Sequence, residues 1–216
     1  MNLARLLQLA SPALPVGAYS YSGGLEAAIE AGVVDDAASA ERWIGDVLEF
    51  SVARMEGPML VSLISAFSAT ELSEAEMLNA KFLASRETAE LRAETVQMGY
   101  SMSRLLGDLG LGAVPLAEPA FPAAFAFAVS QWKIEAEAAL QAYLWAWLEN
   151  QVMAAVKAIP LGQTDGQRIL LSLGNGLEAM SRKIAAMKDE EIGNFAPGLA
   201  MLSAKHETQY SRLFRS

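Results

Sequence analysis

The most apolar part of the chain, residues 125–159, limits what the rest of it can fold into. It contains Trp132, Trp145 and Trp147, and its apolar side chains fall on every face of a helix built from this sequence. A helix that is apolar all round has to be covered by other elements. We therefore expect this stretch to form the central helix, or pair of helices, of a bundle.

Other segments repeat apolar residues at helical spacing. This spacing predicts helices over residues 3–10, 25–32, 59–67, 86–106 and 197–205. A longer helix, capped by Asp36 or Ser39, carries an apolar stripe through Trp43 and Val47. Because no run of β-branched residues alternates with period two, we expect no sheet. The predicted fold is all-α, a multi-helix bundle in which residues 1–216 form a single domain.

Turn and capping residues predict where several helices begin and end. Gly57-Pro58 should end or kink the helix before it, and Ser73 with Glu76 matches a capping box. Thr164 can cap a helix that reaches about Met187. Residues 107–122 form a long connection and a candidate hinge, without the change in composition that would indicate a second domain.

Composition excludes several classes of function. The chain has no cysteine and one histidine, which excludes thiolate catalysis and structural zinc sites. A formal net charge of −9 argues against broad binding to nucleic acid or an anionic membrane. The apolar run 138–148 is shorter than the roughly 20 residues that span a bilayer. Pro12 and Pro15 interrupt the N-terminal apolar run, whereas a secretory signal needs a continuous one. We infer a cytoplasmic protein.

The chain offers little for catalysis. Ser20, Tyr21 and Ser22 are its clustered hydroxyls, and the single imidazole of His206 lies far along the sequence. Their simpler interpretation is a turn and a helix cap, although a hydrolase or transferase using Ser20 or Ser22 remains the rival hypothesis. No phosphate-binding loop and no His-Glu-x-x-His motif occurs. We predict a protein that is not an enzyme and has no catalytic residue.

A metal site of its own is a second alternative. His206 and Glu207 supply at most two ligands, too few for a tight site, although a twofold dimer would double the number. We therefore expect no metal site and no tightly bound cofactor. An apolar fraction of 53% with 19% charged residues instead favours surfaces that other subunits cover.

The segment from Lys157 to Gln163 has two interpretations. Pro160 can end a helix whose C-terminal dipole Lys157 complements. Alternatively, the loop presents a cation and an amide to a partner. Composition does not separate the two.

Four segments together resemble the family of the urease accessory protein UreF. They are LASPALPVGAYSYSGGLE at 9–26, RETAELR at 86–92, KAIPLGQ at 157–163 and SAKHETQYSRLF at 203–214, in the order of the family. Gly23 departs from the pattern, which has a larger polar residue such as Gln there, so this chain lacks the contacts that such a side chain would make. The resemblance covers the chain from end to end.

The resemblance implies an all-helical homodimer that binds the accessory protein UreD, also called UreH, and recruits the GTPase UreG. It also implies that the assembled complex handles nickel and inserts it into apo-urease. In that complex, a protein of this family would modulate GTP hydrolysis by UreG. The partner-binding residues it indicates are Tyr19, Lys157, Gln163, His206, Glu207, Tyr210, Arg212, Leu213 and Phe214.

Residues 206–216, the tail, are expected to be the partner-docking segment. Burying Tyr210, Leu213 and Phe214 returns less free energy than the backbone entropy lost on fixing the tail. We therefore predict a tail that is loosely held until UreD binds, with Leu213-Phe214 as its anchor and Arg212 and Tyr210 as polar contacts.

Overall fold

Helices joined by loops make up residues 3–216, the part of the chain that the computed structural model describes, and no strand occurs in that part. The α-helices are α1 (Leu3–Ala10), α2 (Leu25–Glu30), α3 (Ala37–Val47), α4 (Gly57–Ser68), α5 (Leu72–Ala84), α6 (Ala89–Asp108), α7 (Phe121–Gln131), α8 (Ala136–Ala158), α9 (Gln163–Gly174), α10 (Leu177–Ala185) and α11 (Pro197–His206). Two 3₁₀ turns, η1 (Ala18–Ser20) and η3 (Asp189–Glu191), and a π-helix, η2 (Leu48–Glu56), complete them. The all-α prediction is confirmed.

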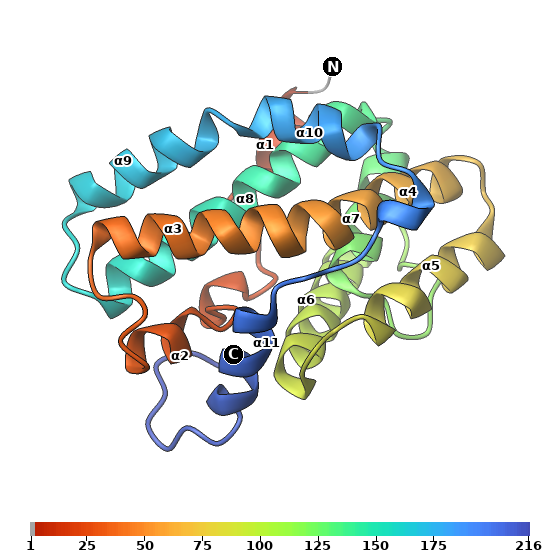
Figure 1. Ribbon diagram of the computed structural model, residues 1–216. Helices are drawn as coiled ribbons and strands as arrows, with labels where there is room; N and C mark the ends of the chain where they lie inside the picture. Colours follow the sequence, from red (N-terminus) through yellow and green to blue (C-terminus); the bar gives the residue numbers. More distant parts are fainter. Residues whose placement is uncertain (1–2) are drawn as a thin grey trace.

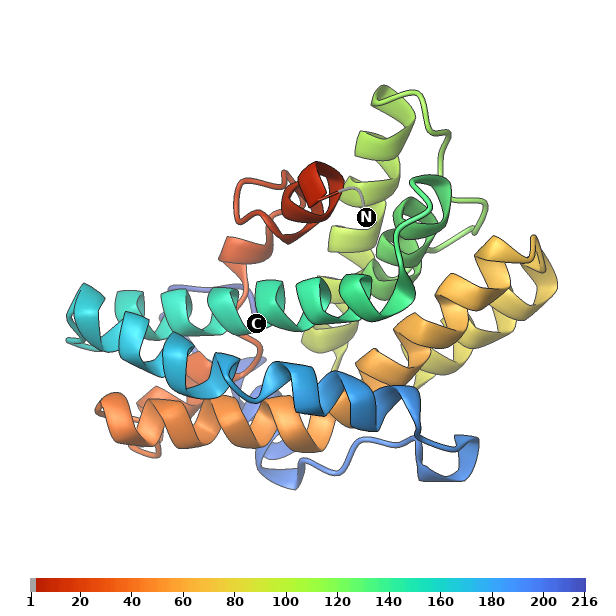
Figure 2. The ribbon, with the colours of Figure 1, turned by 90° about the horizontal axis from the view of Figure 1, so that it is seen from above.

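The apolar stretch 125–159 forms the middle of the bundle as a helix pair, α7 and α8. Figure 2 shows α8 between α1 on one side and α3 with α9 on the other. Leu140, Leu144 and Leu148 of α8 are completely buried, as is Val129 of α7. The predicted central position is therefore confirmed.

The chain stays helical through Gly57-Pro58, so the predicted end of the helix at this point is wrong. α3, η2 and α4 follow one another as a single helical rod from residue 37 to residue 68 (Figure 1). Pro58 has no N–H for the carbonyl of Arg54, but that carbonyl accepts a hydrogen bond from the N–H of Gly193 at 3.1 Å. The N–H of Phe195 similarly donates to the carbonyl of Phe50 at 3.1 Å. Two N–H groups of the loop at residues 193–195 thus donate hydrogen bonds to backbone carbonyls of this helical rod.

Helix starts agree with the sequence in one place and differ in two. The Asp36 carboxylate accepts the Ser39 N–H at 2.7 Å and caps α3. The hydrogen bond from the Ser39 hydroxyl, followed by the one from the Ser39 N–H, holds the pKa of Asp36 below its usual range. α5 begins at Leu72 and α9 at Gln163, both without a side-chain cap, so the predicted caps at Ser73 and Thr164 are wrong. The predicted helix to Met187 is two helices, because the chain turns between Gly174 and Leu177.

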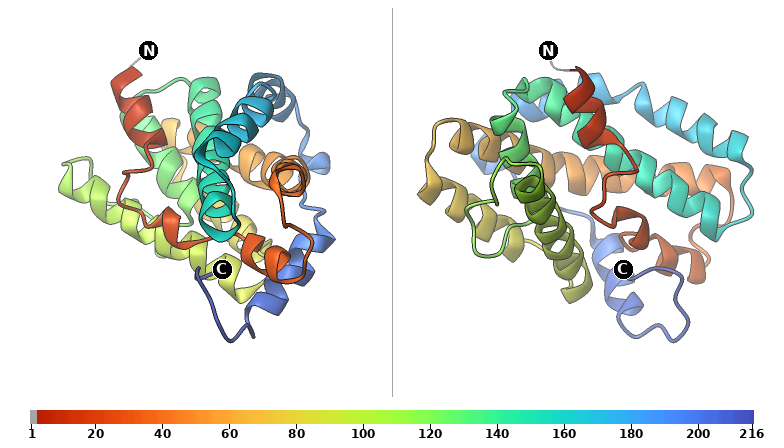
Figure 3. Two further views of the ribbon diagram at one scale, coloured as in Figure 1. Left: turned by 90° about the vertical axis from the view of Figure 1, so that its left-hand side faces the viewer. Right: turned by 180° about the vertical axis from the view of Figure 1, so that it is seen from behind.

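The tail folds back onto the body rather than hanging from it. α11 packs on α2, and the chain beyond it loops round to the segment that precedes α2 (Figure 3). There the Arg215 N–H donates to the Ser20 carbonyl at 2.9 Å, and the Ser22 N–H donates to the Ser216 carbonyl at 3.0 Å. Within residues 3–216, no helix has the length and apolar character needed to cross a membrane.

Candidate partner-docking site

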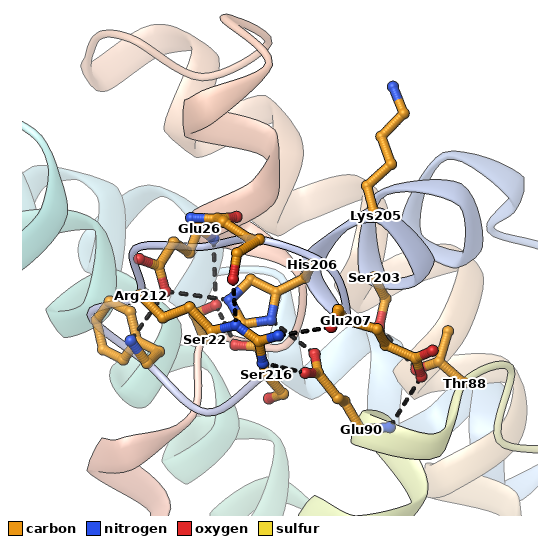
Figure 4. A network of polar contacts seen from close by, with 12 residues as sticks. Ser22, Glu26, Thr88, Glu90, Ser203, Lys205, His206, Glu207, Arg212 and Ser216 are labelled. Atoms are coloured by element: carbon orange, nitrogen blue, oxygen red, sulfur yellow. Dashed lines mark hydrogen bonds and ion pairs between the residues drawn. The ribbon is translucent and has the colours of Figure 1, made fainter.

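His206 joins three helices below the surface of the molecule. It is the last residue of α11 and has no solvent exposure. Its Nδ1 lies 2.6 Å from Oε2 of Glu90 at the start of α6, and its Nε2 lies 3.2 Å from Oε2 of Glu26 in α2 (Figure 4). The structure therefore places His206 where it fixes the start of the tail, beneath any surface that a partner could touch.

Glu26 also holds the far part of the tail. Its two carboxylate oxygens accept the backbone N–H groups of Leu213 and Phe214 at 2.6 and 2.8 Å (Figure 4). Hydrogen bonds to a carboxylate are stronger than those between neutral groups. One side chain in the first turn of α2 thus fixes the backbone of two consecutive tail residues.

Arg212 closes the tail into a loop. Its Nη1 lies 2.5 Å from Oε1 of Glu90, while its Nη2 and Nε donate to the carbonyls of Glu207 and Gln209 at 2.6 and 2.8 Å. The guanidinium therefore links α6 to both ends of the turn that follows α11. The predicted polar role of Arg212 is, in this structure, a contact within the chain.

Glu207 caps the start of α6 from a distance. Its Oε1 accepts the N–H groups of Ala89 and Glu90 at 2.9 and 3.3 Å. These amides have no partner inside their own helix, and a negative charge is favourable at a helix N-terminus. Thr88 completes the cap, because its Oγ1 accepts the Leu91 N–H at 3.2 Å.

Ser216 sits between the N-terminal segment and α6. Ser22 Oγ donates to its carbonyl at 2.5 Å, and its own Oγ donates to Oε2 of Glu94 at 2.6 Å. Burial raises the pKa of Glu94 to about 7, although the Ser216 hydrogen bond acts in the opposite direction. Ser22 therefore works as a structural hydroxyl, since its Oγ also accepts the Glu26 N–H.

Leu213 and Phe214, expected as one anchor, face different environments. Phe214 is only 5% exposed, and the Lys157 ammonium lies 4.6 Å from the centre of its ring. Leu213 is half exposed and Tyr210 fully exposed. The tail thus uses Phe214 to attach to the last turn of α8 and presents Tyr210 and Leu213 outward.

Tyr19 and Gln163 are both exposed but lie in different parts of the fold. Tyr19 belongs to η1 and is 75% exposed, next to the Ser20 carbonyl that the tail reaches. Gln163 is the first residue of α9, across the short turn from Lys157. The structure thus gathers most of the predicted residues around the tail, with Tyr19 beside it and Gln163 beyond the end of α8.

The carboxylates that organise this site were missed at the sequence level. Glu26 and Glu90 fall inside the segments 9–26 and 86–92, and each stands in the first turn of a helix. Their presence in two of the family-like segments was the available signal. Over residues 3–216, no three His, Asp or Glu side chains are grouped so that they could hold a metal ion.

Comparison with known proteins decides the family. The UreF family model matches residues 34–174, and the urease accessory protein UreF of Azoarcus sp. (strain BH72) is 58% identical over 225 residues. The chain belongs to the UreF family of urease accessory proteins. That alignment covers 100% of this chain and 96% of the Azoarcus protein, and UreF of Dechloromonas aromatica (strain RCB) is 55% identical with 100% and 98% covered.

Family membership gives the broad function. This UreF chain is an accessory protein of urease maturation and not an enzyme in its own right. A bifunctional urease accessory protein UreEF from Bordetella bronchiseptica is 50% identical over 225 residues, which is 100% of this chain and 52% of that longer protein. The family named from the four sequence segments is therefore confirmed.

Proposed function

We propose that this chain is a scaffold for urease maturation: a homodimer that binds UreD/UreH in the cytoplasm and recruits the GTPase UreG, so that the assembled complex inserts nickel into apo-urease. Nickel stays with the complex, and the scaffold modulates GTP hydrolysis by UreG. Membership of the UreF family supports this function. The bifunctional UreEF relative, which combines two accessory activities in one protein, supports work within a larger assembly.

The outward face of the tail carries the proposal for UreD/UreH binding. Tyr210 is fully exposed and Leu213 half exposed, while the backbone between and beside them is held by Arg212 and Glu26. Aromatic and apolar side chains on a fixed backbone bind at a lower entropic cost than the same side chains on a loose segment. The tail is therefore a preorganised docking surface, which replaces the earlier expectation of ordering on binding.

Co-purification with UreD tests this role directly. The double variant Tyr210→Ala/Leu213→Ala removes only exposed side chains and should leave the tail network in place. We expect it to lose most of the UreD that the unchanged chain retains. Met77→Ala on α5, which truncates an apolar side chain about as exposed as that of Leu213, is the matched control and should retain UreD in full. Full retention by the double variant would contradict the proposal.

Lys157 and Gln163 are proposed to face UreG. Both are exposed and stand on either side of the turn between α8 and α9. Lys157 also contacts Phe214 of the tail, so a partner bound to the tail adjoins a partner bound at this turn. Pull-down of UreG with Gln163→Ala, in the presence of UreD, tests this part independently: we expect less UreG and unchanged UreD.

A further inference from the structure

A cavity of about 330 Å³ lies inside the helical body. Its walls are mostly apolar and come from distant parts of the chain, including Leu9 of α1, Met98 of α6 and Trp147 of α8. Tyr19 and Met153, which are both exposed, also border it, so it lies close to solvent there. Cavities of roughly 300–1,000 Å³ with apolar walls and a few polar groups are the usual small-molecule sites of proteins.

Three carboxylates line this cavity, and only one of them has a counter-charge. Oε1 of Glu56 lies 2.9 Å from Nη1 of Arg86, and Oε2 of Glu56 accepts the Tyr143 hydroxyl at 2.7 Å. The charge of Arg86 is therefore already used. Glu94 and Glu149 form no ion pair with a lysine, arginine or histidine of residues 3–216. The cavity thus has two carboxylates that no cation of the described chain neutralises.

Both unpaired carboxylates are accessible from the cavity. Oε2 of Glu94 accepts the Ser216 hydroxyl at 2.6 Å, whereas Oε1 accepts no hydrogen bond from residues 3–216. That second oxygen is not sealed inside the protein either, so it is open at the cavity wall. Glu149 stands one helical turn before Met153 on α8, where the cavity approaches solvent. One carboxylate therefore lies in the wall and the other near the mouth.

The environment of these two carboxylates favours an added positive charge. Burial raises the pKa of Glu94 to about 7, against the Ser216 hydrogen bond and with the help of the Glu56 charge. Burial also raises the pKa of Glu149, although a hydrogen bond with the Trp145 side chain acts in the opposite direction. Carboxylates withdrawn from water are normally paired with a cation or fully hydrogen-bonded. A cationic ligand would supply the partner that the chain lacks.

Aromatic rings complete the requirements of a site for an organic cation. Phe121, Tyr143 and Trp147 line the same cavity, and the first two rings lie 5.7 Å apart, centre to centre. Ring faces attract ammonium groups, and apolar walls cover the remaining body of a ligand. From this arrangement we propose that the cavity binds an organic ammonium ion with an apolar body, its nitrogen toward Glu94 and Glu149 and its body among the rings. An anion would meet unpaired carboxylates there instead.

Isothermal titration of the full chain with phenylbutylamine tests the proposal. Phenylbutanol and phenylbutyrate have the same apolar body and serve as the neutral and anionic probes. We expect saturable binding of one amine per chain, with the alcohol weaker by about tenfold or more and the carboxylate weaker still. Because Glu94 is partly protonated at about pH 7, amine binding should also release protons, so that its heat depends on the buffer. No saturable amine binding, or equal binding of amine and alcohol, overturns the proposal.

Isosteric variants separate the proposed site from apolar adsorption. Glu94→Gln/Glu149→Gln removes both unpaired charges and keeps an acceptor for Ser216, so it should bind the amine no more tightly than the alcohol. Glu149→Gln alone should lose part of the preference for the amine. Glu76→Gln, an exposed change on α5 outside the cavity, is the matched control and should keep the preference in full. Circular dichroism establishes that each variant is folded. An unchanged preference in the double variant would also overturn the proposal.

Discussion

Two carboxylates, those of Glu26 and Glu90, attach the tail to helices α2 and α6. Each faces one nitrogen of His206, and each also accepts from the tail, Glu26 from backbone amides and Glu90 from Arg212. Removing a carboxylate from water is costly unless hydrogen bonds replace its hydration. Here every carboxylate oxygen has a donor or a ring nitrogen beside it, so the cost is offset.

Glu26→Gln should loosen the tail while the helices stay folded. The amide retains one acceptor oxygen but turns its NH₂ group toward an N–H donor, so one tail amide loses its partner. The tail should be destabilised by about 1–3 kcal/mol, the cost of an unsatisfied buried polar group. Hydrogen exchange at the Leu213 and Phe214 amides measures it. Glu30→Gln, an exposed change on the same helix, is the control and should not alter their exchange.

Glu94 gives the protein a defined pH dependence. Because burial raises its folded-state pKa to about 7, the folded state binds a proton between the ordinary pKa near 4.5 and 7 that the unfolded state releases. Its contribution to stability is therefore favourable at low pH and is lost as the pH rises to about 7. Glu94→Gln should melt at a higher temperature than the unchanged chain at pH 8, with the difference shrinking toward pH 5. A difference independent of pH would contradict this assignment.

Which tail residues carry contacts could be anticipated from the sequence, but their partners could not. Leu213-Phe214 was expected as an anchor and Arg212 as a polar contact on a partner, whereas Arg212 and Phe214 make their contacts within their own chain. The amides of Leu213 and Phe214 lie 187 and 188 residues from Glu26 in the sequence. The prediction of a loose tail compared only the free energy of apolar burial with the loss of backbone entropy. It left out the free energy of these long-range polar contacts.

At the scale of the elements, α6 depends on close contact with the loop before α7. A Cβ on Gly99 would lie 2.0 Å from the carbonyl oxygen of Pro119 and 2.7 Å from the carbonyl carbon of Ala120. The side chain of Asn79 holds the same loop, donating to the Glu118 carbonyl at 2.9 Å and accepting the Ala120 N–H at 2.8 Å. The loop cannot retreat without breaking these hydrogen bonds.

Gly99→Ala should therefore destabilise the protein by about 1–3 kcal/mol or more, as overpacking does. Gly107→Ala provides the comparison, because it lies in the same helix with nothing within 4 Å of the new Cβ. There the loss of backbone freedom in the unfolded chain should raise stability by about 0.4–1 kcal/mol. Urea denaturation of both variants measures the two opposite changes. Equal effects would mean that the loop moves away from α6.

Helix identity was predictable, whereas several helix ends were not. Apolar periodicity reports burial, and burial of α8 is what made the central stretch recognisable. Pro58 misled because proline's missing N–H normally ends a helix, and the compensating Gly193 lies far along the chain. The caps predicted at Ser73 and Thr164 were wrong because a capping pattern shows only that a side chain is able to cap a helix, not that it does.

At the scale of the whole molecule, the tail and the turn after α8 meet through Lys157 and Phe214. Lys157→Ala removes the cation from the ring, a loss of about 0.5–1 kcal/mol at an exposed site, and leaves α8 otherwise intact. We expect normal helicity and normal UreD binding but altered urease activation in a reconstituted assay. Lys183→Ala, another exposed lysine in the last turn of a helix, should leave activation unchanged. A Lys157→Ala variant that simply unfolds would favour a capping role instead.

The π-helix has a consequence for how one helix serves two sets of neighbours. α3 packs against α8 and α9, whereas α4, further along the same rod, packs against α5 and α7. The wide turns between them, with their i→i+5 bonds, rotate the later side chains relative to a regular α-helix. Removal of one residue from 48–56 would therefore let the backbone become more regular while turning the whole face of α4 away from its partners. The number of residues in this stretch is thus fixed by the direction in which the side chains of α4 must point, and not by the regularity of the backbone in the stretch itself.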